Sequence, residues 1–136
     1  MAALASDRHT PSRSGKSRSF PVKGATRIHA GALVAVTAAG LAVPGSTSAT
    51  LKGVGRAEAR VDNSAGGDGA ARIEVGAEIY RFDNSAGADE ITAGNIGDPA
   101  FIVDDHTVAK TDGTGTRSKA GTVFDVDGIG VWVAFA

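Results

Sequence analysis

The stretch of the sequence with the most chemical potential is Asp104-Asp105-His106, where an imidazole follows two carboxylates. Carboxylate oxygens and an imidazole nitrogen are ligands that a divalent cation accepts. Consecutive residues of a strand point to opposite faces, so three adjacent ligands do not converge unless the chain turns. We therefore interpret this stretch as a polar strand exit and expect no metal site.

A nucleophilic triad is a second possibility for His106. Ser118 and Asp125 supply the other two residue types, but the chain has no Gly-x-Ser-x-Gly elbow, and a triad is defined by geometry that sequence does not supply. Of the other two histidines, His9 lies in a basic N-terminal stretch and His29 beside an apolar run. We expect no catalytic residue, and hence no enzyme.

Two Gly-containing segments imitate ion-binding loops without completing them. Asp125-Val126-Asp127-Gly128 matches the opening of a calcium loop, yet no closing Glu follows it. Gly66-Gly67-Asp68-Gly69 lacks the Lys that a phosphate loop needs, and Asp68 would repel an anion. The sequence therefore predicts no cofactor.

Composition indicates which elements must position these residues. The 136 residues include 19 Gly and no Cys, and the apolar 42% contains only five Phe, one Tyr and one Trp. So many Gly favour turns over long helices, and the missing Cys excludes disulfides and thiolate ligands. We predict one all-β domain, a small antiparallel β-barrel or sandwich of the β-tulip kind. Its thin core would gain stability from association.

Strands are expected wherever small and β-branched residues run between turn signals. The segment Ala71–Phe82 has the clearest alternation, with Ile73, Val75, Ala77 and Ile79 on the buried face. A single helical turn is expected at Ile91–Ile96 and a turn at Thr111–Thr116. The other expected strands are Ala32–Thr37, Leu41–Val43, Leu51–Val61 and Phe101–Val103, followed by a hairpin of Gly121–Val126 and Gly130–Phe135 joined through Asp127-Gly128.

The uncharged segment Ile28–Val43 allows two interpretations. It follows a basic stretch and precedes small residues, as the apolar part of a secretory signal does. It also contains Gly31 and Gly40, has few Leu, and is too short to span a bilayer. We favour a strand, a turn and a second strand, and expect no membrane partner.

Charge divides the chain into an expected basic arm, residues 1–27, and a single β domain, residues 28–136. The arm has six basic residues and one acidic residue, whereas the remainder has eight basic and fourteen acidic residues. Nucleic acid is not the expected partner, because the arm has only Phe20 for base stacking and the acidic body would be repelled. The candidate contact residues of the arm are Arg8, Arg13, Lys16, Arg18 and Arg27.

The aromatic residues Tyr80, Trp132 and Phe135 are the remaining candidates, either for the core or for contacts between copies of the chain.

The sequence contains one short internal repeat. Val61-Asp62-Asn63-Ser64-Ala65-Gly66 recurs as Phe82-Asp83-Asn84-Ser85-Ala86-Gly87, with only the first residue changed. Each copy follows an expected strand. We interpret both as strand-exit turns in which the Asp or Asn side chain bonds nearby backbone.

The C-terminal half contains three characteristic stretches, Tyr80–Gly87, Phe101–Arg117 and Gly121–Gly128. Together they resemble a family of small tailed-phage head proteins, the capsid cement or decoration proteins of Mu-like and related phages and prophages. The similarity covers most of the chain, including 7–11, 30–34 and 43–46.

This resemblance implies a β-rich protein on the outer face of the virion capsid. It implies a homotrimer, the major capsid protein as partner, an extended arm over neighbouring capsid subunits, and no enzymatic residues. The alternative is a surface-exposed virion module that binds a carbohydrate or host receptor. Its contact loops would be Asp83–Ala88 and Thr111–Thr116, with Trp132 and Tyr80 available to stack on a sugar ring.

Overall fold

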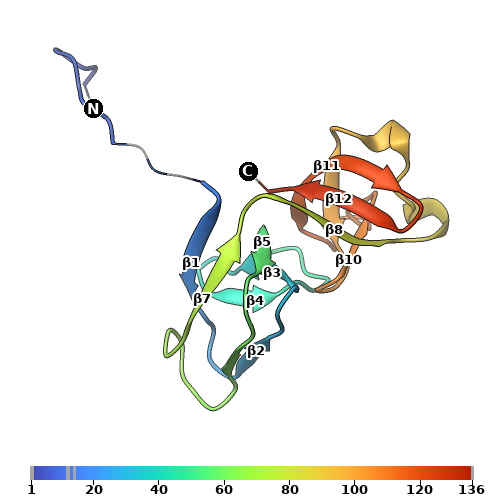
Figure 1. Ribbon diagram of the computed structural model, residues 1–136, viewed down its shortest axis with the longest axis horizontal. Coiled ribbons are helices and arrows are strands. Elements are labelled where there is room, and N and C mark those ends of the chain that lie inside the picture. The colour runs from blue at the N-terminus through green and yellow to red at the C-terminus, as the bar shows by residue number, and fades with distance from the viewer. Residues whose placement is uncertain (1, 12, 14, 136) are drawn as a thin grey trace.

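The computed structural model describes residues 2–11, 13 and 15–135, and it is all-β, as predicted (Figure 1). The regular elements of these residues are short strands and two 3-10 turns. They are β1 (Ser17–Pro21), β2 (Thr26–Ile28), β3 (Leu33–Val36), β4 (Ala42–Pro44), β5 (Lys52–Ala57), β6 (Val61–Asn63), β7 (Arg72–Gly76), β8 (Ile79–Asn84), η1 (Gly87–Asp89), η2 (Ala93–Asn95), β9 (Pro99–Ile102), β10 (Thr107–Ala109), β11 (Lys119–Asp127) and β12 (Gly130–Ala134).

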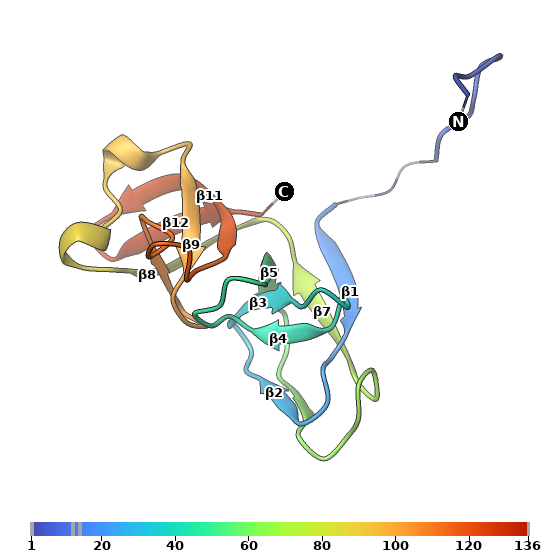
Figure 2. The ribbon, with the colours of Figure 1, turned by 180° about the vertical axis from the view of Figure 1, so that it is seen from behind.

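The strands form two lobes that lie side by side in both ribbon views (Figures 1 and 2). The N-terminal lobe is a five-stranded sheet of order β1-β7-β5-β3-β4, with β2 and β6 as a separate pair. An isolated parallel bridge from Val22 to Ala42 joins the region after β1 to β4, so this sheet curls almost onto itself. The C-terminal lobe is a closed barrel of order β10-β8-β12-β11-β9. Within the barrel, β8 and β10 run parallel and the other pairs are antiparallel.

Strand β3 belongs to the cores of both lobes. All four of its residues are buried, because Leu33 and Ala35 point toward the barrel while Val34 and Val36 point into the N-terminal lobe. The sequence of a strand that is covered on both faces is apolar throughout and does not alternate between apolar and polar residues, and this explains the Leu-Val-Ala-Val sequence of β3. The two lobes therefore pack as one body.

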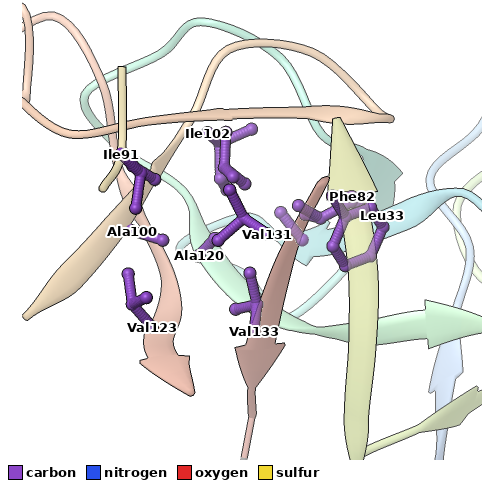
Figure 3. Close-up of a cluster of buried hydrophobic side chains, with 11 residues drawn as sticks. Leu33, Phe82, Ile91, Ala100, Ile102, Ala120, Val123, Val131 and Val133 are labelled. Carbon is purple, nitrogen blue, oxygen red and sulfur yellow. The ribbon is translucent and has the colours of Figure 1, made fainter. Parts of the chain in front are cut away.

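The barrel core is built from branched aliphatic side chains and one aromatic ring (Figure 3). Ile102, Val131 and Val133 are fully buried, and Phe82 and Leu33 lie together at the side facing the N-terminal lobe. Strand β5 crosses β11 so closely that a Cβ at Gly53 would overlap the backbone of Ala120. The scarcity of large aromatic residues is thus compensated by close approach of the backbone.

The strand–turn–strand prediction for the uncharged segment is confirmed by β3 and β4, and so is the turn of helix near Ile91, as η2. Three details are wrong. The predicted strand Leu51–Val61 is two strands, because β5 ends at Ala57 and β6, which begins at Val61, pairs with β2. The predicted strand Ala71–Phe82 is two strands, because the chain leaves one sheet at Ala77 and enters the barrel at Ile79, which is exposed. The hairpin turn consists of Gly128-Ile129, since Asp127 still pairs with Gly130.

The boundary predicted at residue 27 for the arm also differs from the structure. Residues 17–21 form β1, which pairs with β7, and residues 26–28 form β2, which pairs with β6. The part that projects from the body is residues 2–11, 13 and 15, all of which are exposed, and we call these residues the exposed arm (Figure 1). In the described part of the chain, no helix has the length and apolar character needed to cross a membrane.

In both copies of the repeated sequence, the Asn side chain forms hydrogen bonds with backbone groups of another segment. The Asn63 side chain is buried and donates to the carbonyl oxygens of Val22, Lys23 and Gly67, at 2.9–3.2 Å. The Asn84 side chain bonds both backbone groups of Ile91. Both copies stabilise the loop that follows a strand. The Asn side chains bond residues farther away in the sequence than the two-residue spacing of an isolated Asx turn.

Candidate functional site

The exposed arm and the surface at its root form the most distinctive feature of the molecule (Figure 1). Within the arm, Arg8 donates a hydrogen bond to the hydroxyl of Thr10, a contact that anchors nothing to the body. The side chain of Leu4 is 75% exposed. An exposed segment with charged and apolar side chains but few contacts to its own body is typical of sequences that become ordered on a partner.

A groove of about 630 Å³ lies where the exposed arm meets the body, and we call it the arm-root groove. The link between β7 and β8 forms one wall, and β11 and β12 form the other. Two backbone hydrogen bonds fix these walls, from the Ala77 N–H to the Lys16 carbonyl at 2.9 Å and from the Phe135 N–H to the Glu78 carbonyl at 3.1 Å. The lining residues are Gly15, Lys16, Ala77, Glu78, Ile79, Phe124 and Ala134.

Phe124 is the largest apolar side chain of this groove, and it is 56% exposed. It sits at a β-bulge, because Val123 pairs with Val133 while Asp125 pairs with the next residue, Trp132. The bulge lets Phe124 and Asp125 both face outward while Val126 still packs on the barrel core. The side chain therefore points away from the core of its own chain.

The five predicted basic contact residues divide into two groups. Arg8 and Arg13 belong to the exposed arm, and Lys16 lies at its root. Arg18 and Arg27 lie in strands instead: Arg18 donates to the Val54 carbonyl, and Arg27 forms an ion pair of 3.1 Å with Asp62. The hydroxyl and backbone N–H of Ser64, and then Arg27, hold the pKa of Asp62 well below its usual range.

The three predicted aromatic residues also have different environments. Tyr80 and Phe135 are partly buried against the barrel core, with ring centroids 6.2 Å apart. Trp132 lies outside both cores, and its indole N–H donates to Asp127 at 2.8 Å. For Trp132, the core alternative is wrong, whereas a contact with a second copy of the chain stays a prediction.

His106 lies between carboxylates from two segments. Its Nδ1 is 2.9 Å from Asp83, and its Nε2 is 3.4 Å from Asp104. The hydrogen bond to Asp83, followed by the charge of Asp104, raises the pKa of His106. Asp105 joins Asp104 and His106 in a group whose ligand atoms lie within 4.8 Å of one another, because a turn replaces the straight strand considered above. The imidazole is 65% exposed and the two carboxylates are half-buried. The expectation that these three ligands do not converge is therefore wrong, whereas the absence of a metal site stays a prediction.

The residues considered for a triad have separate roles. The Ser118 hydroxyl donates to the Ser48 carbonyl at 2.6 Å and accepts the Leu51 N–H at 2.9 Å. Asp125 accepts its bond from the neighbouring Val126 N–H. Ser118 therefore holds the segment that precedes β5 against the start of β11. Neither hydrogen bond of its hydroxyl involves His106.

The two loops considered for ligand binding are joined through Asp89. The Asp89 carboxylate accepts hydrogen bonds from Thr111 and from Arg117, the latter at 3.2 Å. The Thr111 hydroxyl, and then Arg117, lower the pKa of Asp89. Trp132 and Tyr80, the candidates for sugar stacking, lie on β12 and β8 and are occupied by contacts of the body.

The fold and its surface define a class: a small all-β body with a closed barrel, an exposed basic arm and an apolar groove at the root of that arm. No family model matches the chain, and no curated protein or solved structure matches it either.

Sequence reasoning missed Ile79 and Phe124 as surface residues. Adjacent strand residues face opposite sides, so either Val123 or Phe124 had to point outward, and both are apolar. The alternation that placed Ile79 inside assumed an unbroken strand. The Gly76 and Ala77 pair of small residues was the only local signal that the chain could bend between sheets there.

Proposed function

We propose that this chain is a structural protein of a tailed-phage virion, which decorates the outer face of the capsid and clamps neighbouring major capsid subunits. The observation that carries the proposal is the exposed arm, which projects from a compact body with Arg8 and Arg13 in solvent. The resemblance of residues 80–87, 101–117 and 121–128 to capsid cement proteins supports it.

The mechanism that we propose is mechanical. The body takes its position on the shell, and the arm becomes ordered as it crosses to the next capsid subunit. Arg8, Arg13 and Lys16 contact acidic patches of the capsid surface. A closed oligomer, proposed to be a trimer, joins several weak contacts into one avid attachment. Because such a protein binds the assembled shell and not free subunits, it stabilises the shell by mass action.

The placement of Arg18 and Arg27 refines this proposal. Each already has a partner in the body, so the main electrostatic contribution to capsid binding falls to Arg8 and Arg13. The ion pairs that they form with the shell are solvent-exposed and therefore sensitive to salt.

The test is co-sedimentation with empty heads assembled from the major capsid protein of the same tailed phage or prophage. The intact protein is expected to bind, and a variant that lacks residues 2–15 is expected to bind at least tenfold more weakly. The deletion stops before β1, so circular dichroism should show the same β-strand content as in the intact protein. The double variant Arg8→Ala with Arg13→Ala is expected to bind more weakly and with less salt dependence. Failure of the intact protein to bind such heads would exclude the proposal.

A further inference from the structure

We infer that the arm-root groove is the docking site for the N-terminal end of the exposed arm of a second copy of this chain, with Leu4 seated against Phe124 and Ile79. This inference rests on the proposed function and deepens it by naming the partner of the groove. Each arm would cross the shell from its own body and end on the neighbouring copy.

The groove is suited to an apolar segment. Its open side presents Phe124, Ile79 and Ala134 from three adjacent strands, β11, β8 and β12. Ala134 pairs with Thr122 on one side and Ile79 on the other, so Thr122, Ala134 and Ile79 form a row across the barrel surface, and Phe124 follows Thr122 by two residues on β11. Both walls are fixed by backbone hydrogen bonds, and therefore an incoming segment meets a preformed site.

The exposed arm has a matching apolar end. Leu4 has Ala2, Ala3 and Ala5 as neighbours, and its side chain is more exposed than any other large hydrophobic residue of the described chain. Small neighbours allow the backbone to approach the groove closely, and a single Leu is a suitable anchor for it. Burial of both Leu4 and Phe124 would remove two exposed apolar side chains at once.

Charge complements the apolar contact. Glu78 is exposed on the rim of the groove, while Arg8 follows Leu4 by four residues and Arg13 lies farther along the arm. The body beyond residue 27 carries fourteen acidic and eight basic residues. The attraction of the basic segment therefore comes from Glu78 together with the acidic excess of the body, and Lys16, which also lines the groove, opposes it in part.

The exposed arm is long enough for its N-terminal end to reach a neighbouring copy of the chain. Gly15 follows Leu4 by eleven positions, and an extended chain of that length reaches roughly 36 Å. A body of this size has a radius of gyration of about 14 Å and a diameter comparable with that reach. In both ribbon views the arm runs away from its own body, so the end of the arm lies far from the groove at its own root (Figures 1 and 2). Repetition of this head-to-tail contact closes a ring when the rotation from one copy to the next matches the symmetry of a closed oligomer.

The experiment uses the natural absence of Cys. Full-length Leu4→Cys protein is mixed with full-length, affinity-tagged Phe124→Cys protein and oxidised. We expect a disulfide between the two chains, with a yield at least tenfold above that of Leu4→Cys mixed with tagged Ile129→Cys. Ile129 is the matched control, because it is 69% exposed but lies outside the groove. Equal yields would overturn the inference.

A doubly substituted chain, Leu4→Cys with Phe124→Cys, distinguishes the other occupants. A disulfide within one chain that persists on dilution would mean that the arm folds onto its own groove, and it would overturn the inference. Light scattering supplies an independent measurement. The intact chain and Ile129→Asp should form the same oligomer, whereas Phe124→Asp and the variant lacking residues 2–11 should be monomers. A variant without these residues that remains oligomeric would also refute the arm contact.

Capsid binding is measured separately, and so the two proposals can fail separately. Binding of the intact protein to heads without an arm-to-groove disulfide would retain the proposed function and remove this inference. The disulfide without head binding would retain the arm contact and remove the decoration function.

Discussion

Asn84 holds Ile91 by both backbone groups: its side-chain amide donates to the Ile91 carbonyl at 2.8 Å, and its side-chain oxygen accepts the Ile91 N–H at 2.9 Å. Ile91 is buried in the barrel core, seven residues farther along the chain. These two hydrogen bonds close the loop that contains η1 and place the Ile91 side chain in the barrel core.

Replacement of Asn84 should therefore destabilise the fold. Asn84→Ala leaves two backbone groups of a buried residue without these partners, at a cost of about 1–3 kcal/mol for each group that water does not reach. Asn84→Asp keeps an acceptor but loses the donor, so we expect an intermediate loss at neutral pH. Urea unfolding measures both. Asn95→Ala is the control, since Asn95 bonds an exposed turn and should cost less. Equal stability of Asn84→Ala and the natural protein would contradict this role.

The sequence predicted the two Asn-containing turns but not the distance over which they act. Local rules indicate that Asn63 and Asn84 bond nearby backbone, whereas the partners Val22 and Ile91 become neighbours only in the folded chain. The same limit applies to Arg27 and Asp62, which are adjacent because β2 pairs with β6. Periodicity identifies strands, but it does not show which strands pair.

The arm-root groove depends even more on tertiary structure. Ile79 was expected inside because it continues the alternation of Ile73 and Val75, and it lies outside because the chain changes sheets between β7 and β8. The bulge at Phe124 is likewise produced by pairing with β12. The basic residues near the N-terminus were visible in the sequence, but only Arg8 and Arg13 belong to the exposed arm, because residues 17–21 and 26–28 pair as strands.

His106 provides a pH-dependent prediction. Its pKa is raised by Asp83 and then by Asp104, so the stabilisation from the protonated imidazole is fully present below the ordinary value of about 6.5 and is lost as pH rises through the higher folded value. His106→Gln should remove this part of the pH dependence of stability. The charged groups facing the imidazole are Asp83 on β8 and Asp104 and Asp105 on its own turn.

An NMR titration of the His106 ring measures the same linkage directly. Asp83→Asn should lower the titration midpoint toward the ordinary value, and Asp105→Asn should lower it less, because Asp83 makes the hydrogen bond. A midpoint that does not respond to Asp83→Asn would show that this bond does not set the protonation of His106.

The shared strand β3 predicts that the two lobes unfold together. Leu33 is buried in the barrel core and Val34 in the N-terminal core, so each substitution to Ala should weaken the entire body. We expect a loss of about 2–5 kcal/mol for Leu33→Ala and about 2 kcal/mol for Val34→Ala. Urea unfolding followed by Trp132 fluorescence, which reports on the barrel, should shift in both variants. A Val34→Ala transition unchanged at Trp132 would mean that the lobes unfold independently.

Gly53 tests whether close backbone packing replaces large side chains in this thin core. A Cβ at this position would overlap the carbonyl oxygen and Cα of Ala120, and neither backbone atom can rotate away as a flexible side chain could. Gly53→Ala must therefore separate β5 from β11, and we expect it to cost about 1–3 kcal/mol. Gly128→Ala is the matched control, because a Cβ there meets open space. Urea unfolding of both variants decides the question: if Gly53→Ala is no less stable than Gly128→Ala, the two strands have room between them, and the lobes are held together by the side chains of β3 instead.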